Sequence, residues 1–132
     1  MFTLPILKRI MDIPIQTEIV IERVVDGDTI ALSEPIAGAD KIRLDGIDTP
    51  ETRSAKCRKE RNLGYEAKGF ARALLEGRAV TVVHSGKKGR YGRLIARIVI
   101  DGQDYSQIML DKGYAVRWTK AWRETPKEKR WC

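Results

Sequence analysis

The sequence predicts a mainly β protein with helices (α+β), in which five strands form a small barrel and two or three helices pack on it. Segments rich in β-branched residues recur between turn sequences, and one long helical pattern interrupts them after the third strand. The composition, with 42% hydrophobic and 33% charged residues, is that of a globular protein. A chain of 132 residues fits one domain large enough to bury a core.

Three strands are expected in the first part of the chain, at 17–25, 29–32 and 40–47. The first segment is rich in β-branched side chains that partly alternate with polar ones. Asp26-Gly27 indicates a tight turn after it, because glycine accepts a positive φ without a Cβ penalty. The three strands are therefore expected to form a meander.

A helix is expected next, with Asn62 capping its start and Gly77 ending it. Its evidence is a set of apolar residues at helical spacing, namely Leu63, Ala67, Phe70, Ala71, Leu74 and Leu75. Such a stripe buries one face of the helix against the sheet.

Two more strands are expected at 80–84 and 93–100, followed by a second helix that carries the apolar residues 108–110. A small five-stranded sheet twists too strongly to stay open, and a helix between strands three and four suits a closed barrel. This order is that of an OB-fold, whose face commonly binds oligonucleotides.

Residues 17–124 are assigned to the barrel domain, 1–16 to an N-terminal extension and 125–132 to a charged C-terminal tail. The stretch Met1–Ile15 is interrupted by charges and has no apolar core followed by a small-residue cleavage site, so no signal peptide is expected. The default expectation is a cytoplasmic protein, and secretion or a periplasmic location are the alternatives.

The charge balance favours a polyanionic partner. Twenty-five Lys and Arg residues stand against 18 Asp and Glu, which leaves a net charge of +7. A charge of this sign and size is typical of nucleic-acid binding. A solvated basic surface is the alternative interpretation.

The two cysteines, Cys57 and Cys132, are too few for a zinc cage in a chain with a single histidine. They either form a disulfide or remain free thiols, and a cytosolic setting favours free thiols. The sequence leaves the pairing open.

Two acidic turn sequences, at 26–29 and 48–51, indicate a metal site. Asp28 and Asp48 offer hard carboxylate oxygens, which suit calcium or magnesium. Thr49 precedes a proline, which favours an extended backbone that points its carbonyl toward the site.

Taken singly, both acidic sequences are ordinary turns. Their combination with Arg43 and Arg93 favours metal-assisted attack on a phosphate. Hydrolysis of a phosphodiester needs a positioned water, a base and positive charge on the transition state, and these residue types supply all three.

Five separated blocks share the order and spacing of a known family: Val24–Thr29, Arg43–Glu51, Gly64–Ala67, Arg90–Leu94 and Gly113–Ala115. Through these blocks the chain, from about residue 17 to 115, resembles the staphylococcal nuclease (thermonuclease) family. The resemblance implies a five-stranded OB barrel with packed helices. It also implies calcium-dependent hydrolysis of DNA and RNA, mainly as an endonuclease with little base specificity, leaving 3′-phosphates.

The resemblance implies that Asp28, Asp48 and the backbone carbonyl of Thr49 bind Ca²⁺, with Asp26 as a supporting acid. The expected partners are DNA and RNA, with single strands or frayed duplexes preferred. No membrane is expected, and the protein is expected to act as a monomer.

For catalysis, the resemblance assigns Glu51 as the general base and Arg43 and Arg93 as the two arginines that clamp the phosphate. Planar guanidinium groups make paired bonds to phosphate oxygens, which a lysine does not. Arg90 and Tyr91 match a lysine and a tyrosine that contact a terminal phosphate.

The chain departs from the family pattern after Ala115. Trp118 or Trp122 stacks on a base in one interpretation, and in the other an indole covers the base of the barrel. Two rival functions are a non-catalytic OB-fold module that binds nucleic acid, and a protein-interaction or calcium-sensing domain. The retained carboxylates argue against the first rival, because without a metal they repel phosphate.

Overall fold

The computed structural model describes residues 14–132, so most of the predicted N-terminal extension, residues 1–13, lies outside the described part. One continuous sheet runs in the order β1-β6-β7-β4-β3-β2. Its strands are β1 (Ile15–Val20), β2 (Arg23–Asp26), β3 (Thr29–Ile36), β4 (Ala39–Leu44), β6 (Ala79–Lys88) and β7 (Leu94–Ile100). Short β8 (Gln103–Asp104) pairs with β7, and β5 (Ile47–Asp48) pairs with β9 (Val116–Arg117) in a separate sheet.

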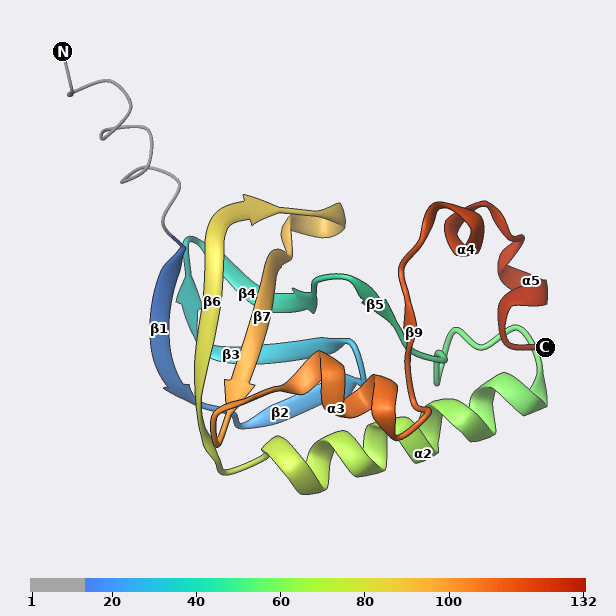
Figure 1. Ribbon diagram of the computed structural model, residues 1–132, viewed down its shortest axis with the longest axis horizontal. Helices are drawn as coiled ribbons and strands as arrows, with labels where there is room; N and C mark the ends of the chain where they lie inside the picture. Colours follow the sequence, from blue (N-terminus) through green and yellow to red (C-terminus); the bar gives the residue numbers. More distant parts are fainter. Residues whose placement is uncertain (1–13) are drawn as a thin grey trace, which may run out of the picture.

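The main sheet curls into a half-barrel (Figure 1). Its two ends are β1, paired with β6, and β2, paired with β3. Only Ile21 and Glu22 separate these two strands in the sequence, so the predicted strand 17–25 is one bent segment that belongs to both ends. The structure confirms the predicted α+β fold with an OB-type barrel.

The parallel pairing of β4 with β7 aligns Arg43 with Ile95, and β3 aligns Thr29 with the same Arg43. Ile42 and Leu44, on either side of Arg43, are buried in the barrel. Because side chains alternate along a strand, Arg43 lies on the outer face, next to the first residues of β3 and β7.

Four α-helices lie within the described residues: α2 (Arg58–Leu75), α3 (Tyr105–Asp111), α4 (Lys120–Glu124) and α5 (Lys127–Arg130). Helix α2 runs along one side of the barrel, and α4 and α5 lie beyond β9, close to the start of α2 (Figure 1). Residues 125–132, predicted as a charged tail, thus include a helix. None of the helices in residues 14–132 has the length and apolar character needed to cross a bilayer.

Helix α2 begins one turn earlier than predicted. Its N-cap is Cys57, not Asn62, and the Cys57 sulfur accepts the N–H of Glu60 at 3.3 Å. Asn62 is a helical residue inside the second turn. The predicted end is confirmed, since Gly77 follows the helix with φ of +78°.

Candidate active site

Asp28 and Asp48 meet beside the barrel, although 20 residues of chain separate them. Asp28 follows β2 and Asp48 lies on β5, and they are 3% and 8% exposed. The backbone N–H of Thr49 donates to Asp28 Oδ2 at 3.0 Å, and the Thr29 hydroxyl donates to Asp28 Oδ1 at 3.0 Å. These bonds fix the orientation of the Asp28 carboxylate.

Gly27 allows this close approach. A Cβ at Gly27 would lie 2.9 Å from the Thr49 methyl carbon and 3.0 Å from the end of Met109. Its φ is not positive, so the prediction that glycine serves a left-handed turn here was wrong. The turn needs glycine because a side chain at this position would collide with Thr49 and Met109. It is also held by Tyr105 of α3, whose hydroxyl donates to the Gly27 carbonyl at 2.6 Å.

The Arg43 guanidinium lies between the two carboxylates. Its Nη2 is 3.4 Å from Asp28 Oδ2 and 3.7 Å from Asp48 Oδ1. Its Nη1 donates to the backbone carbonyls of Leu44 and Ile47, both at 2.8 Å. Arg43 therefore ties the β4–β5 turn together while it faces both acids.

The two carboxylates fit a hard divalent cation. Burial raises the pKa of Asp48, the Trp122 hydrogen bond opposes that rise, and the Asp28 charge adds to it. Thr49 Oγ1 is buried there without a hydrogen-bond partner among the described residues. Within residues 14–132 no three His, Cys, Asp or Glu side chains form a metal-binding group. A cation would thus take its other ligands from backbone carbonyl, water or substrate oxygens.

Glu51 lies in the loop that follows β5, and α2 fixes its backbone. Glu60 Oε2 accepts the Glu51 backbone N–H at 3.1 Å. A Cβ at Gly64 would overlap the Glu51 carbonyl group, with 2.7 Å to the carbonyl carbon. Gly64 thus lets the helix press directly against this backbone.

The Glu51 side chain is strongly perturbed. Burial is the main cause that raises its pKa to about 7, followed by the charges of Asp28, Asp26 and Asp48. A carboxyl group with this pKa exchanges its proton close to neutral pH, which suits a general base or acid.

Arg93 enters the site from the start of β7. Burial and the nearby Arg43 charge lower its pKa. Its Nε donates to the Arg90 carbonyl at 3.1 Å, and its guanidinium carbon lies 5.5 Å from the centre of the Tyr91 ring. Tyr91 is 88% exposed and has a φ of +61°. Tyr91 and Arg93 line one pocket together with Glu51.

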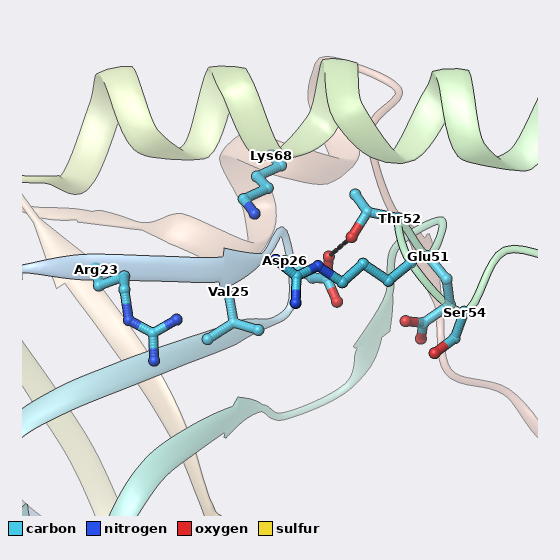
Figure 2. A pocket seen from close by; sticks show the side chains of 8 residues that line it. Arg23, Val25, Asp26, Glu51, Thr52, Ser54 and Lys68 are labelled. Atoms are coloured by element: carbon cyan, nitrogen blue, oxygen red, sulfur yellow. Dashed lines mark hydrogen bonds between the residues drawn. The ribbon is translucent and has the colours of Figure 1, made fainter.

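A second pocket, of about 270 Å³, adjoins the first because Asp26 and Glu51 line both. The cations Arg23 and Lys68 lie among the residues of its wall, and Lys68 reaches from α2 toward Asp26 (Figure 2). Thr52 donates its hydroxyl to Asp26 Oδ1 at 2.8 Å. Burial nevertheless raises the pKa of Asp26, with this hydrogen bond opposing the rise.

Two tryptophans also contact the site. Trp122 Nε1 donates to Asp48 Oδ2 at 2.8 Å, and Trp131 Nε1 approaches the same oxygen at 3.3 Å. This polar contact with an acid is a feature of Trp122 that the sequence did not predict, beside the two interpretations of base stacking and of covering the barrel base.

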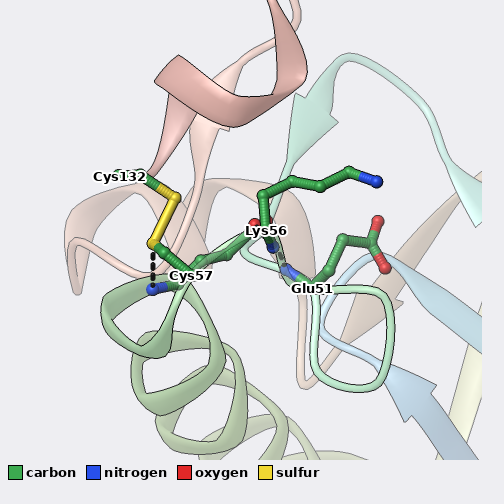
Figure 3. The surroundings of a disulfide bond; sticks show 5 residues. Glu51, Lys56, Cys57 and Cys132 are labelled. Atoms are coloured by element: carbon green, nitrogen blue, oxygen red, sulfur yellow. Dashed lines mark hydrogen bonds between the residues drawn. A yellow bond between two sulfur atoms is a disulfide. The ribbon is translucent and has the colours of Figure 1, made fainter.

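Cys57 and Cys132 form a disulfide with a Cα–Cα distance of 6.1 Å, so of the two states that the sequence left open the structure has the disulfide, not the free thiols that a cytosolic setting favours. The bond joins the start of α2 to the segment that follows α5 (Figure 3). In the same view the Glu51 carboxylate points away from the disulfide, on the other side of the loop.

The structure brings the predicted acids and arginines into one region, and Arg90 and Tyr91 lie at its edge. Sequence reasoning missed Glu60, Trp122 and Trp131 as partners of these residues. Glu60 had a local signal, because it lies three residues after the N-cap, as the acid of a capping box does. The two tryptophans had no such signal in the local sequence.

Comparisons with known proteins agree with this geometry. A family model described as "Staphylococcal nuclease homologue" matches residues 41–131. The chain is 34% identical over 103 residues to Endonuclease YhcR of Bacillus subtilis (strain 168), covering 73% of this chain and 8% of that protein. It is 32% identical over 94 residues to the Thermonuclease of Staphylococcus hyicus, covering 70% of this chain and 54% of that protein.

A third relative is the SPbeta prophage-derived endonuclease YokF of Bacillus subtilis (strain 168). It is 30% identical over 100 residues, which cover 74% of this chain and 33% of that protein. The chain thus spans between 8% and 54% of the length of these three relatives. On the strength of the matching family model and the site geometry, the chain belongs to the staphylococcal nuclease homologue family.

Proposed function

We propose that this chain is a calcium-dependent nuclease that hydrolyses DNA and RNA with little base specificity, mainly as an endonuclease, and leaves 3′-phosphate ends. The observation that carries the proposal is the pair of buried acids, Asp28 and Asp48, with Arg43 3.4 and 3.7 Å from them. Relatives that carry the names endonuclease and thermonuclease support it.

In this proposal Asp28, Asp48 and the Thr49 carbonyl hold the cation. When bound, Ca²⁺ supplies positive charge that polarises the phosphate and offsets the charge of the transition state. The carboxylates and the carbonyl are oxygen ligands of the kind that calcium prefers. Asp26, which accepts a hydrogen bond from the Thr52 hydroxyl, supports the site.

Glu51 orients the attacking water and takes its proton. Its pKa of about 7 keeps a large fraction of the carboxylate ionised at neutral pH, while its conjugate acid is still able to return a proton. Glu60 and Gly64 hold the Glu51 backbone against α2, so the base stays close to the cation site.

Arg43 and Arg93 stabilise the phosphate in the transition state. Their charges are close enough that Arg43 lowers the pKa of Arg93, so both guanidinium groups can contact the same phosphate. Two fixed cations of this kind offset the charge that develops on the phosphate oxygens. Arg90 and Tyr91, at the exposed edge, contact a terminal phosphate in this proposal.

The basic pocket next to Glu51 is proposed to accept the neighbouring phosphates of the strand. Arg23, Arg53 and Lys68 line it, and its wall is shared with the pocket of Arg93. Cations along the path of the backbone give affinity without base readout. A single strand or a frayed duplex is the preferred substrate, and the protein acts as a monomer.

The test is to incubate the purified protein with single- and double-stranded DNA and RNA in calcium, magnesium or chelator. Cleavage in calcium that chelator abolishes is the expected result, with end-labelling used to identify 3′-phosphates. A mobility shift without cleavage under all conditions would replace the nuclease with a nucleic-acid-binding module.

A further inference from the structure

The three tryptophans of this protein all lie in residues 118–132, a segment that we call the strap. Trp122 and Trp131 direct their indole N–H groups at Asp48 Oδ2, at 2.8 and 3.3 Å. The ring centre of Trp118 lies 5.9 Å from the guanidinium carbon of Arg43. The strap therefore reaches two proposed site residues with side chains that come from outside the barrel.

Both indole N–H groups donate to the same oxygen, Oδ2, of the Asp48 carboxylate. Their rings meet edge to face, with centres 5.2 Å apart and an angle of 75°. The opposite oxygen, Asp48 Oδ1, is the one that faces Arg43. Two donors on Oδ2 restrict rotation of the carboxylate, so Oδ1 stays directed toward Arg43.

The strap has little packing of its own. Helix α4 has five residues and α5 has four, and neither contains a buried residue. Helices this short are not stable in isolation. The Arg130 guanidinium joins them by donating to the carbonyls of Trp122, Thr125 and Arg123, at 3.1, 3.0 and 2.6 Å.

The strap is attached to the rest of the molecule at both ends. The backbone N–H of Trp118, next to β9, donates to the Gly46 carbonyl at 2.9 Å, and Cys132 is bonded to Cys57. Trp131 is the residue before Cys132, so the disulfide restrains the backbone that carries this indole. Cutting this bond would leave α5 held by the Arg130 hydrogen bonds to α4 and by the contact of Trp131 with Asp48.

We propose that Trp122 and Trp131 are positioning residues that hold the cation-binding carboxylate of Asp48, and that the Cys57–Cys132 disulfide keeps the strap in place for this task. The inference rests on the proposed function, because it takes Asp48 as a calcium ligand. Groups that hydrogen-bond to a metal ligand fix its orientation, and losing them typically lowers metal affinity 10–100-fold.

The test measures calcium affinity by titration calorimetry, without nucleic acid. Phenylalanine keeps most of the ring volume and removes the N–H donor. We expect Trp122→Phe and Trp131→Phe each to weaken calcium binding several-fold, and the double variant to weaken it about 10–100-fold. Ala121→Ser is the matched control, because Ala121 is an exposed residue of α4 next to Trp122 whose small side chain does not hold Asp48, and it should bind calcium like the wild type.

The tether is tested with Cys57→Ser and Cys132→Ser, which break the same bond from its two ends. Serine is a good N-cap, so Cys57→Ser keeps an acceptor for the Glu60 N–H and isolates the effect of the tether. Both variants should lose calcium affinity to the same extent. Wild-type affinity in both would overturn the role of the disulfide.

Asp48→Asn separates the inference from the function on which it rests. If Asp48→Asn binds calcium like the wild type, the proposed cation site is wrong. If Asp48→Asn loses binding while the double tryptophan variant keeps wild-type affinity, the cation site stands and the positioning role is wrong. Circular dichroism shows that each variant is folded, and the single variants carry the test if the double variant is not.

Discussion

Glu60 Oε2 accepts a hydrogen bond from the backbone N–H of Glu51 at 3.1 Å. The other oxygen, Oε1, accepts the backbone N–H of Lys56 at 2.7 Å, and Glu60 is only 3% exposed. One buried carboxylate in the first turn of α2 therefore satisfies two backbone donors of the loop that carries the proposed base.

Glu60→Ala should destabilise the protein and reduce its nuclease activity together. The substitution leaves two backbone N–H groups unpaired, and each such group costs about 1–3 kcal/mol when buried. Lys56 is exposed, so water can satisfy its N–H, and we expect the free energy of unfolding in urea to fall by about 1–3 kcal/mol. Glu66→Ala, at an exposed position of the same helix, should change it by less than about 0.5 kcal/mol. Equal effects from both variants would contradict the role of Glu60.

Gly64→Ala should damage activity by displacing Glu51. An added Cβ would lie 2.7 Å from the Glu51 carbonyl carbon and 3.0 Å from the Pro50 oxygen, so backbone must shift. A displacement of about 1 Å at a reacting group costs up to about a hundredfold in rate, and we expect kcat/KM to fall by that order.

Gly69→Ala is the control for this prediction. Nothing lies within 4 Å of a Cβ at Gly69, which is an exposed position of the same helix. Alanine is a better helix former than glycine, so this variant should be more stable by up to about 1 kcal/mol with unchanged activity. An equal loss of activity in both variants would show that helix composition, not contact with Glu51, sets the rate.

The sequence was sufficient for the barrel and for the proposed site residues because their signals are local. Strand segments bounded by turn sequences place Asp28 and Asp48 at strand ends, and strand periodicity carries Arg43 to the outer face. The acids meet because β3 pairs with both β2 and β4, and a short turn leads from β4 to β5.

The contacts of the strap had no local signal. Asp48 and Trp131 are 83 residues apart, and their contact depends on how α4 and α5 pack, which propensity does not determine. The start of α2 was missed for a related reason. Its cap is a cysteine, outside the Ser, Thr, Asp and Asn set that marks helix starts in a sequence.

Arg43→Ala and Arg93→Ala should both reduce kcat/KM by at least about a hundredfold, since each removes positive charge from the transition state. They should differ in stability. Arg43 Nη1 donates to the carbonyls of Leu44 and Ile47, whereas the Arg93 side chain donates to the Arg90 carbonyl at an exposed position. Thermal unfolding should therefore detect a loss for Arg43→Ala and little change for Arg93→Ala. Wild-type activity in either variant would refute the proposed role of that arginine.

Lys68→Ala should affect long substrates more than short ones. Lys68 lines the pocket next to Glu51, where the proposed strand path places a neighbouring phosphate. We expect a higher KM and a weaker salt dependence on an oligonucleotide, and no change on a substrate with a single phosphodiester. Lys112→Ala, at an exposed position outside this pocket, is the control. An equal effect on short and long substrates would contradict the strand path.

The pKa of Glu51 predicts how stability depends on pH when calcium is removed by chelator. Its folded value of about 7 lies above the ordinary value of 4.5, so the folded state binds this proton more tightly than the unfolded state. The stabilisation is full below about pH 4.5 and is lost as the pH rises through 7. The pKa values of Asp26 and Asp48 are raised in the same direction, so they add to the same trend.

Glu51→Gln should therefore be more stable than the wild type at pH 8 in chelator, and the difference should shrink toward pH 4.5, as thermal unfolding at both values would show. Calcium should reduce the difference at pH 8, because a ligand that binds only the folded state stabilises it and offsets the crowded carboxylates. Parallel pH profiles for the two proteins in chelator would mean that the Glu51 carboxylate is not perturbed.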